Sequence, residues 1–289
     1  MKPRPFDYVR ADSIDEVLAC LAEHGDNARI LAGGQSQVPM LNFRLIETEV
    51  LIDINRIPAL DYIRIEGGAL EIGAATRQAD LKDWPELGAK VPLLAAAMPY
   101  LGHFQTRNRG TVCGSIAHSD PSSELPLSLA LLGGEVVLQS RRGKRTVKAA
   151  EFQVDLLTTD KRSDEMITAV RFPLARQGTG YAFDEMARRQ GDFAIVSLAA
   201  AVSETSVRLG IGGVAATPAV RDWPIADLGL DDAAGDDAKG DDARLDDALN
   251  AFAWDLGGSN DIHASAQYRR QLVRRLGRRT IMEARKCRN

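Results

Sequence analysis

The chain has 289 residues, which exceeds the usual size of one domain and predicts two domains or one domain with an extension. Hydrophobic residues make up 45% of it and charged residues 26%, as in ordinary globular proteins rather than disordered or fibrous ones. A formal net charge of −4 without a strongly basic stripe argues against nucleic acid and anionic membrane surfaces as partners, which leaves small ligands and proteins.

The N-terminal residues lack the apolar core of a signal peptide, and the longest apolar run, 125–132, is too short to span a bilayer. We therefore expect a cytoplasmic chain. Cys20, Cys113 and Cys287 are odd in number and lack CxxC spacing, and the four histidines are scattered. The sequence therefore predicts neither a disulfide framework nor a metal or iron–sulfur site within this chain.

The first elements alternate between helix and strand. Ser13 and Glu16 form a capping box ahead of a helical apolar period that ends at Gly25. A short strand, 29–32, then runs into a glycine-rich bend, and the segment 38–45 can begin another helix although it contains a proline, because proline suits a first turn.

The rest of the chain continues this mixture, so we expect an α+β fold. Alternating or continuous apolar runs predict strands at 50–54, in a hairpin over 63–76, in a hairpin over 135–148, at 166–172, and in a pair at 194–202 and 207–211. Residues 177–180 interrupt the pattern as a domain boundary does. The acidic, repetitive segment 231–248 predicts a surface linker, and a basic amphipathic helix over 265–285 closes the chain.

The glycine bend, residues 32–36 (AGGQS), has a possible chemical role. Two glycines can adopt positive φ angles and turn successive backbone N–H groups into a concave nest for an anion such as phosphate. The helix that follows adds its positive dipole end, and Gln35 and Ser36 add side-chain hydrogen bonds. The alternative is purely steric, since any tight strand-to-helix turn needs glycine.

A second loop, 106–126, is dense in small and polar residues between apolar helices, so it must face a polar partner. Its glycines allow close approach of the backbone, and its hydroxyl and carboxylate groups can hydrogen-bond to phosphate or to a ribose-like diol; these residues are Gly110, Gly114, Thr111, Ser115 and Asp120. Two such loops suit a dinucleotide. The usual dinucleotide and P-loop motifs, GxGxxG and GxxxxGK[ST], are both absent.

The bend AGGQS together with RNRGTVCGSIAHSDPSSELP at 107–126 resembles the flavin-binding subunit of the molybdenum hydroxylases, the family of aerobic carbon monoxide dehydrogenase and xanthine dehydrogenase. The resemblance extends to ARRQGDFAIVSLAAAV at 187–202 and DIHASAQYRRQLVRRL at 261–276. It implies FAD and a vanillyl-alcohol-oxidase or PCMH-type FAD-binding domain of two α/β subdomains, followed by a sheet-and-helix domain like that of carbon monoxide dehydrogenase flavoproteins.

The resemblance also implies the domain boundaries. The FAD-binding domain is expected at 1–175, with subdomains of about 1–57 and 58–175, and the C-terminal domain at 178–289.

The cofactor contacts implied by the resemblance lie in the two loops and beyond them. Ala32, Gly33, Gly34, Gln35 and Ser36 would wrap the FAD pyrophosphate, and Thr111, Gly114 and Ser115 would complete the cradle. Five further assignments are the hydroxyl ligand Asp120, its neighbour His118, the adenine contact Ile167, and Asp192 and Phe193 near the isoalloxazine. His118 and Phe193 can equally be packing residues. No catalytic acid or base is assigned.

Two positions depart from the family pattern. Cys113 stands where the second loop often has a glycine, and we interpret it as an inert, buried thiol. Glu185 stands where some relatives carry a lysine, which bears on the flavin potential.

In the family, substrate is oxidised at a molybdenum cofactor in a large subunit, and electrons pass through two 2Fe–2S clusters of a small subunit to the flavin. The resemblance therefore implies an electron outlet within a dimer of heterotrimers, with NAD, a quinone, a cytochrome or oxygen as acceptor. Two alternatives remain open: a self-contained flavoprotein oxidase or reductase of the same fold, and a non-enzymatic nucleotide-binding or scaffold protein.

Overall fold

The computed structural model describes residues 1–230 and 238–288, and the chain forms two compact units. The first unit consists of Met1–Pro85, His103–Ser119 and Gly133–Pro173. The second unit consists of Glu86–Gly102, Asp120–Leu132 and Leu174–Asn289. Helices and strands occur in both units, so the predicted α+β class is confirmed.

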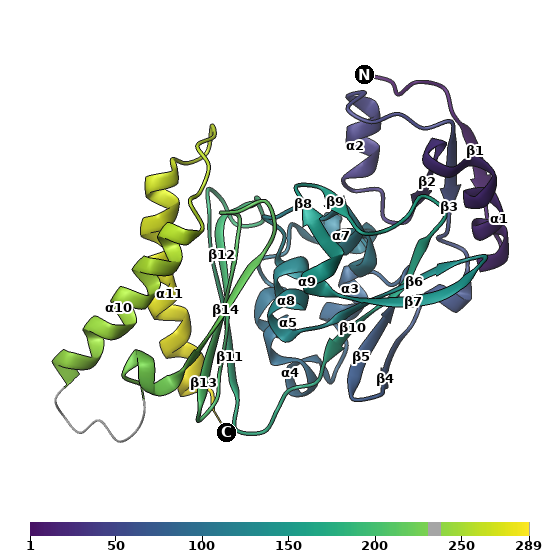
Figure 1. Ribbon diagram of the computed structural model, residues 1–289. Helices are drawn as coiled ribbons and strands as arrows, with labels where there is room; N and C mark the ends of the chain where they lie inside the picture. The colour runs from purple at the N-terminus through teal and green to yellow at the C-terminus, as the bar shows by residue number, and fades with distance from the viewer. Residues whose placement is uncertain (231–237, 289) are drawn as a thin grey trace. The chain divides into compact units, whose positions relative to one another are not determined.

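A three-stranded parallel sheet opens the first unit, in the order β1 (Asp7–Arg10), β3 (Val50–Asp53), β2 (Ala28–Leu31). Parallel strands need crossover connections, and helix α1 (Ile14–His24) lies in the one between the two outer strands, β1 and β2 (Figure 1). Strand β2 ends at the glycine bend, after which the short helix α2 (Gln37–Asn42) begins.

The predicted capping box holds the start of α1. The Ser13 hydroxyl accepts a hydrogen bond from the Glu16 N–H at 3.2 Å. The Glu16 carboxylate reaches back to the N–H of Asp12 at 2.8 Å, one residue before the usual position. The apolar face of the helix buries Val17 and Leu21 against the sheet region.

The first unit also contains a five-stranded antiparallel sheet, which includes the predicted hairpins. Its order is β4 (Ile63–Glu66), β5 (Ala69–Gly73), β10 (Met166–Pro173), β6 (Glu135–Ser140), β7 (Gly143–Lys148). Gly67 and Gly68 form the first turn with φ angles of 58° and 78°, which a two-residue hairpin turn of this hand requires.

Short elements complete the first unit. They are η1 (Gly25–Asn27), η2 (Pro58–Leu60), α3 (Gln78–Lys82), α6 (Phe104–Arg109), α7 (Val112–His118), α9 (Ala149–Phe152), β8 (Gln153–Asp155) and β9 (Thr158–Thr159). Helix α7 packs on strands β5 and β10, which places residues 112–118 of the second loop over the five-stranded sheet.

The second unit is built on an antiparallel meander, β11 (Gly180–Ala187), β12 (Ala194–Val202), β13 (Ser206–Gly212), β14 (Ala219–Pro224). Its helical elements are α4 (Leu87–Lys90), α5 (Pro92–Ala97), α8 (Glu124–Leu132), η3 (Ile225–Leu228), α10 (Ala238–Asp255) and α11 (Ala266–Lys286).

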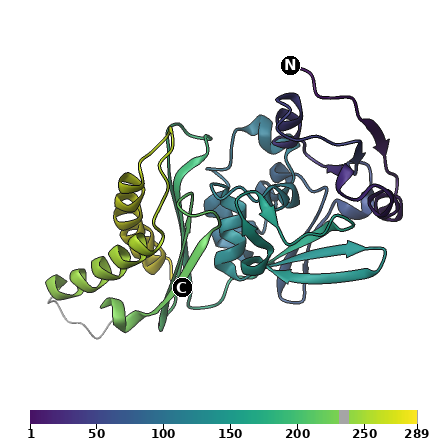
Figure 2. The same cartoon turned by 45° about the horizontal axis from the view of Figure 1, so that its top comes forward.

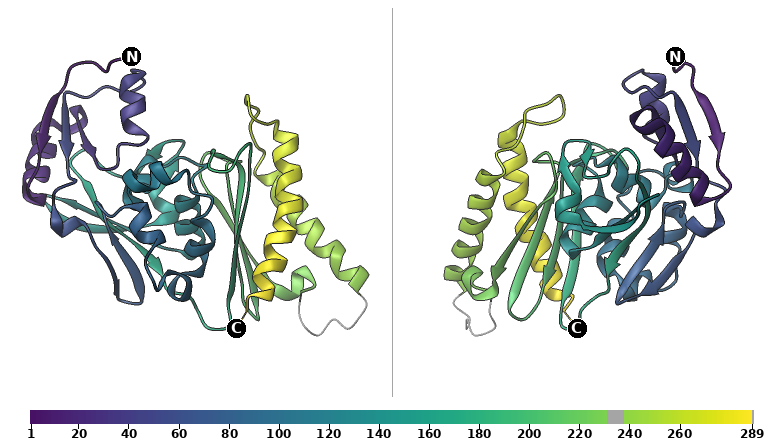
Figure 3. Two further views of the ribbon diagram at one scale, coloured as in Figure 1. Left: turned by 180° about the vertical axis from the view of Figure 1, so that it is seen from behind. Right: turned by 45° about the vertical axis from the view of Figure 1, so that its right-hand side comes forward.

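Helices cover both faces of this meander. Residues of α10 and α11 share a buried cluster with Leu198 and Ala200 on one face, where α11 lies along β11 and β12 and α10 packs against α11 (Figures 2 and 3). Residues of α5 and α8 pack against Phe183 and Ala199 on the other face. Strand β12 is therefore buried on both sides, which suits its continuous run of small and branched apolar residues.

The prediction of a surface linker over 231–248 is only partly testable and partly wrong. Residues 231–237 lie outside the described residues. The remainder belongs to helix α10, in which Leu245 and Leu249 are 1% and 0% exposed. With Phe252 they follow the i, i+4, i+7 spacing of a helical apolar face, which the acidic composition of the segment obscures.

Within the described part of the chain, no helix is both long and apolar enough to cross a membrane.

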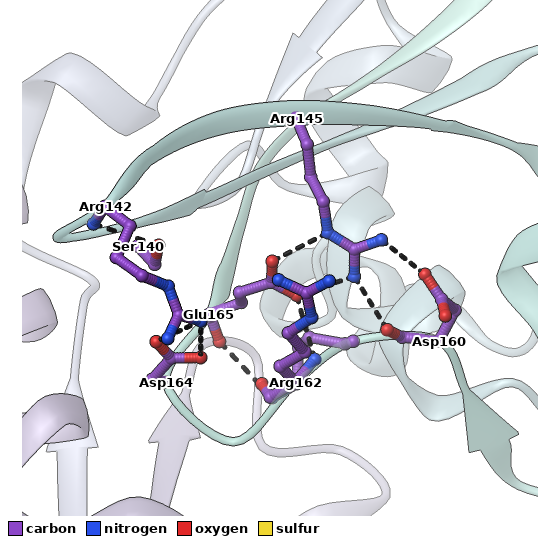
Figure 4. A network of polar contacts seen from close by, with 8 residues as sticks. Ser140, Arg142, Arg145, Asp160, Arg162, Asp164 and Glu165 are labelled. Atoms are coloured by element: carbon purple, nitrogen blue, oxygen red, sulfur yellow. Dashed lines mark hydrogen bonds and ion pairs between the residues drawn. The ribbon is translucent and has the colours of Figure 1, made fainter.

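One ion-pair network in the first unit buries a carboxylate (Figure 4). Glu165, which is 3% exposed, accepts two hydrogen bonds of 2.7 Å from the guanidinium of Arg145 and one of 2.9 Å from the N–H of Arg162. Arg145 also donates to Asp160. Burial alone would raise the pKa of Glu165, but these donors outweigh it and hold that pKa below its ordinary value.

We expect Arg145→Met to lower the free energy of unfolding by about 2–3 kcal/mol at pH 7, because it leaves the Glu165 carboxylate buried without its main donor. Because the pKa of Glu165 is lowered in the folded chain, its ionised carboxylate stabilises the folded state at pH values above the ordinary pKa of glutamate. This stabilisation is lost as the pH falls through the lowered pKa. The difference between the variant and the wild type should therefore shrink below about pH 4.5 in urea unfolding. The control is Arg142→Met, which removes an exposed pair with Asp164 and should cost less than about 1 kcal/mol. Equal losses in the two variants would contradict this assignment.

Candidate functional site

The glycine bend presents a row of backbone donors without partners. Among the residues that the structure describes, the N–H groups of 33–36 donate no hydrogen bond. The Gln35 side chain donates to the carbonyl of Gly33 at 3.2 Å, so it braces the bend internally. Ser36 precedes α2 without capping it through its side chain. Consecutive donors of this kind form an anion-binding nest.

Only one of the two glycines adopts the conformation expected from the sequence. Gly34 has a φ of 70°, whereas Gly33 is not among the residues with positive φ, so the expectation for Gly33 is wrong. The reason for glycine at position 33 is proximity. A Cβ there would lie 2.6 Å from the Arg109 oxygen and from the Gly110 Cα. The bend and the second loop therefore touch backbone to backbone.

The second loop approaches the bend at the start of helix α7. Thr111 is 2% exposed, and its hydroxyl accepts a hydrogen bond from the Gly114 N–H at 3.1 Å, so the threonine caps the helix. A Cβ on Gly114 would lie 2.6 Å from that hydroxyl oxygen, so glycine is needed for the cap. Ser115 is half-buried one residue further along. Gly110 is buried between α6 and α7.

Asn55 contacts the bend, Arg77 contacts the second loop, and the two side chains contact each other. The sequence analysis did not identify either residue. The Asn55 amide donates to the Ala32 oxygen at 2.9 Å, and its own oxygen accepts from Arg77 at 2.6 Å. Arg77 also donates to the Arg109 oxygen. The available signal was positional: Asn55 lies just beyond a predicted strand of the parallel sheet, where the carboxyl ends of neighbouring strands meet.

The other expected residues occupy varied environments. His118 ends α7 and is half-buried, and Ile167 is buried in β10 with 6% exposure. In the second unit, one Asp120 carboxylate oxygen accepts from the Ser122 N–H at 2.9 Å. Asp192 is exposed, and Phe193 is 66% exposed, so the alternative that Phe193 is a core residue is wrong.

Of the two departures from the family pattern, Cys113 is buried and Glu185 is half-buried. Cys113 is 2% exposed and donates to the Ile72 oxygen at 3.5 Å, and burial raises its pKa, so the thiol stays protonated. In the second unit, one carboxyl oxygen of Glu185 is buried with no partner among the described residues. Burial, reinforced by Glu124, raises the pKa of Glu185 to about 8, which favours a neutral acid at pH 7.

These features suit a dinucleotide cofactor with a pyrophosphate. The bend offers unpartnered N–H groups, and no side chain fills the contact between Gly33 and residues 109–111. The arrangement departs from the usual dinucleotide fold, because the bend follows strand β2 of the parallel sheet whereas residues 109–111 connect helices α6 and α7. The fold and site thus define a candidate anion-binding site built from two loops, and the comparisons with known proteins give the family.

Residues 4–175 match the FAD binding domain in molybdopterin dehydrogenase, and residues 181–284 match the CO dehydrogenase flavoprotein C-terminal domain. The chain belongs to this family of molybdopterin dehydrogenase flavoproteins, and it is an oxidoreductase subunit.

Three similar proteins illustrate the range of the family. Subunit alpha of the 6-hydroxypseudooxynicotine dehydrogenase complex of Paenarthrobacter nicotinovorans is 38% identical over 98% of this chain and 96% of its own length. A solved carbon monoxide dehydrogenase from Hydrogenophaga pseudoflava has a chain that superposes with a TM-score of 0.88 at 32% identity, covering 100% of both chains. A chain of quinoline 2-oxidoreductase from Pseudomonas putida 86 gives 0.87 at 31%, covering 99% of both.

We expect Gly33→Ala to abolish stoichiometric FAD binding, because the added Cβ would push apart the bend and residues 109–111. The matched control is Gly88→Ala, which adds the same atom in helix α4 where nothing lies within 4 Å. Flavin content after purification, measured against protein concentration, distinguishes the two variants. A folded Gly33→Ala protein with one FAD per chain would contradict the proposed role of the contact.

Proposed function

We propose that this chain is the FAD-binding, electron-transfer subunit of a heterotrimeric molybdenum, iron–sulfur and flavin hydroxylase, in which it passes electrons from a 2Fe–2S subunit to an external acceptor. The observation that carries the proposal is the backbone contact between the glycine bend and the second loop, within a chain that matches the flavoprotein family over nearly its whole length. The similar proteins are named for unlike substrates: 6-hydroxypseudooxynicotine, carbon monoxide and quinoline. This variety supports placing substrate oxidation on another subunit.

Two groups of residues would hold FAD. Residues 32–36 would hold the pyrophosphate through the unpartnered N–H groups of the bend, with Thr111, Gly114 and Ser115 closing the cradle beside Gly110. The remaining assignments follow the family resemblance. Asp120 would accept from sugar or ribityl hydroxyls with His118 nearby, Ile167 would pack on adenine, and Asp192 and the exposed Phe193 would lie near the isoalloxazine.

When bound, FAD supplies the electron-accepting and electron-donating chemistry. The chain's own residues bind and orient it. The backbone donors of the bend neutralise phosphate charge without a side chain, and the buried Cys113 thiol stays protonated. Glu185 holds a proton at neutral pH inside the second unit. No residue is assigned as a catalytic acid or base.

The wider organisation is also a proposal. We place the FAD-binding domain at 1–175, with subdomains of about 1–57 and 58–175, and the C-terminal domain at 178–289; the two family matches, 4–175 and 181–284, support a division between the two domains. The chain would join a large molybdenum-cofactor subunit and a small iron–sulfur subunit in a dimer of heterotrimers. NAD, a quinone, a cytochrome or oxygen would be the acceptor, and the expected cytoplasmic location stays a prediction.

The first prediction of this proposal is noncovalent binding of one FAD per chain. Acid precipitation of the yellow protein should release the flavin into the supernatant, since the cradle consists of backbone donors and neutral side chains. Absorbance at flavin wavelengths in both fractions measures the outcome. Colour that stays with the precipitated chain would mean a covalent link, for which His118 is the candidate within the two loops.

The second prediction concerns electron supply. Under anaerobic conditions, N-heterocycles, aldehydes or carbon monoxide should bleach the flavin only when the large and small subunits are present. The control is dithionite, which should bleach the flavin of the isolated chain. Bleaching of the isolated chain by one of these substrates would instead support the self-contained oxidase or reductase. A chain that binds no flavin at all would support the non-enzymatic alternative.

A further inference from the structure

Asn55 hydrogen-bonds to the backbone of the glycine bend. It follows strand β3, and its amide donates both to the Ala32 oxygen at 2.9 Å and to the Asp53 carboxylate at 2.6 Å. Asp53 in turn accepts from the Tyr8 hydroxyl and from the Asn55 N–H, the latter at 2.8 Å. Burial alone would raise the pKa of Asp53, but these donors lower it, so the carboxylate that orients Asn55 is charged.

Arg77 hydrogen-bonds to the backbone of the second loop. It immediately precedes helix α3, and its backbone pairs with that of Thr111. Its guanidinium donates to the Arg109 oxygen and, at 2.6 Å, to the Asn55 side-chain oxygen. One planar guanidinium therefore ties the second loop to the residue that supports the bend. The Asn55–Arg77 bridge joins the two loops through the oxygens of Ala32 and Arg109.

The acceptors of Arg77 are unusual for a half-buried cation. Among the described residues Arg77 forms no ion pair, and the acceptors named above are a carbonyl and an amide oxygen. Burial and the neighbouring Arg109 both lower its pKa. A planar fork can satisfy two acceptors at a set separation, whereas the ammonium of lysine cannot reproduce that geometry. The planar geometry of the Arg77 guanidinium, rather than its charge alone, therefore allows it to hold the two acceptors at a set separation.

We propose that Asn55 and Arg77 are positioning residues for FAD. Their bridge sets the separation of the glycine bend and the second loop, so that the unpartnered N–H groups of 33–36 face the pyrophosphate. Neither residue needs to touch the cofactor for this role. The inference rests on the proposed function, since it assumes that the two loops hold FAD.

The test is a titration of the full-length apoprotein with FAD, followed by quenching of flavin fluorescence, for the wild type, Arg77→Lys, Asn55→Ala and the double variant. We expect each single variant to raise the Kd for FAD at least tenfold. The double variant should raise it no further than the larger single effect, because both substitutions break one bridge. The control is Arg64→Lys, which alters an arginine bound to Glu71 in the same unit but in contact with neither loop in the interactions described.

Two further measurements separate positioning from general damage to the fold. The melting temperature of each apoprotein should stay within a few degrees of the wild type, and amide hydrogen exchange should accelerate at 32–36 and 109–111 rather than across the sheets. Wild-type affinity in Arg77→Lys would overturn the inference and leave charge as the role of Arg77. Additive losses, or faster exchange everywhere, would also overturn it. If the wild type itself binds no FAD, the proposed function fails instead.

Discussion

The contact between Gly33 and residues 109–111 is the constraint on which the site depends. A Cβ at position 33 would lie well inside van der Waals distance of three backbone atoms of residues 109–111, and none of them belongs to a side chain that could turn away. The bend follows strand β2 of the three-stranded sheet, and residues 109–111 lead into helix α7, which packs on the five-stranded sheet. The placement of both sheets must therefore be accurate for the contact to form. Position 33 must therefore lack a side chain. Hydrogen bonds from Asn55 and Arg77 hold the two loops in the contact that glycine permits.

The sequence predicted the local elements well, because their signals are local. Gly67-Gly68 between alternating apolar residues and the Ser13/Glu16 box each act over a few residues, and both occur in the structure. Position 33 shows the limit of such reasoning. Positive φ and close backbone approach both select glycine, and only the three-dimensional arrangement shows that Gly34 has the first property and Gly33 needs the second.

Other features were beyond local reasoning. Asn55 and Arg77 are separated by 22 positions and meet only because two sheets end near each other, so no periodicity reveals the pair. The composition of the segment 231–248 led to the prediction of a linker, because its aspartates outnumber the leucines that lie on the buried face of α10. For Phe193 the sequence left a flavin contact and core packing both open, and only the structure, where this side chain is exposed, removes core packing.

The course of the chain through the two units has a consequence for folding and for gene rearrangement. Helices α5 and α8 precede the end of the first family match in sequence, yet they pack against Phe183 and Ala199, which follow it. A ribosome releases these helices before their sheet exists, so Leu93, Leu127 and Leu131 stay exposed until β11 and β12 emerge. Cutting the gene at the family boundary would leave the same leucines uncovered. The two halves are therefore expected to be inherited together, because each lacks part of its own interior when separated.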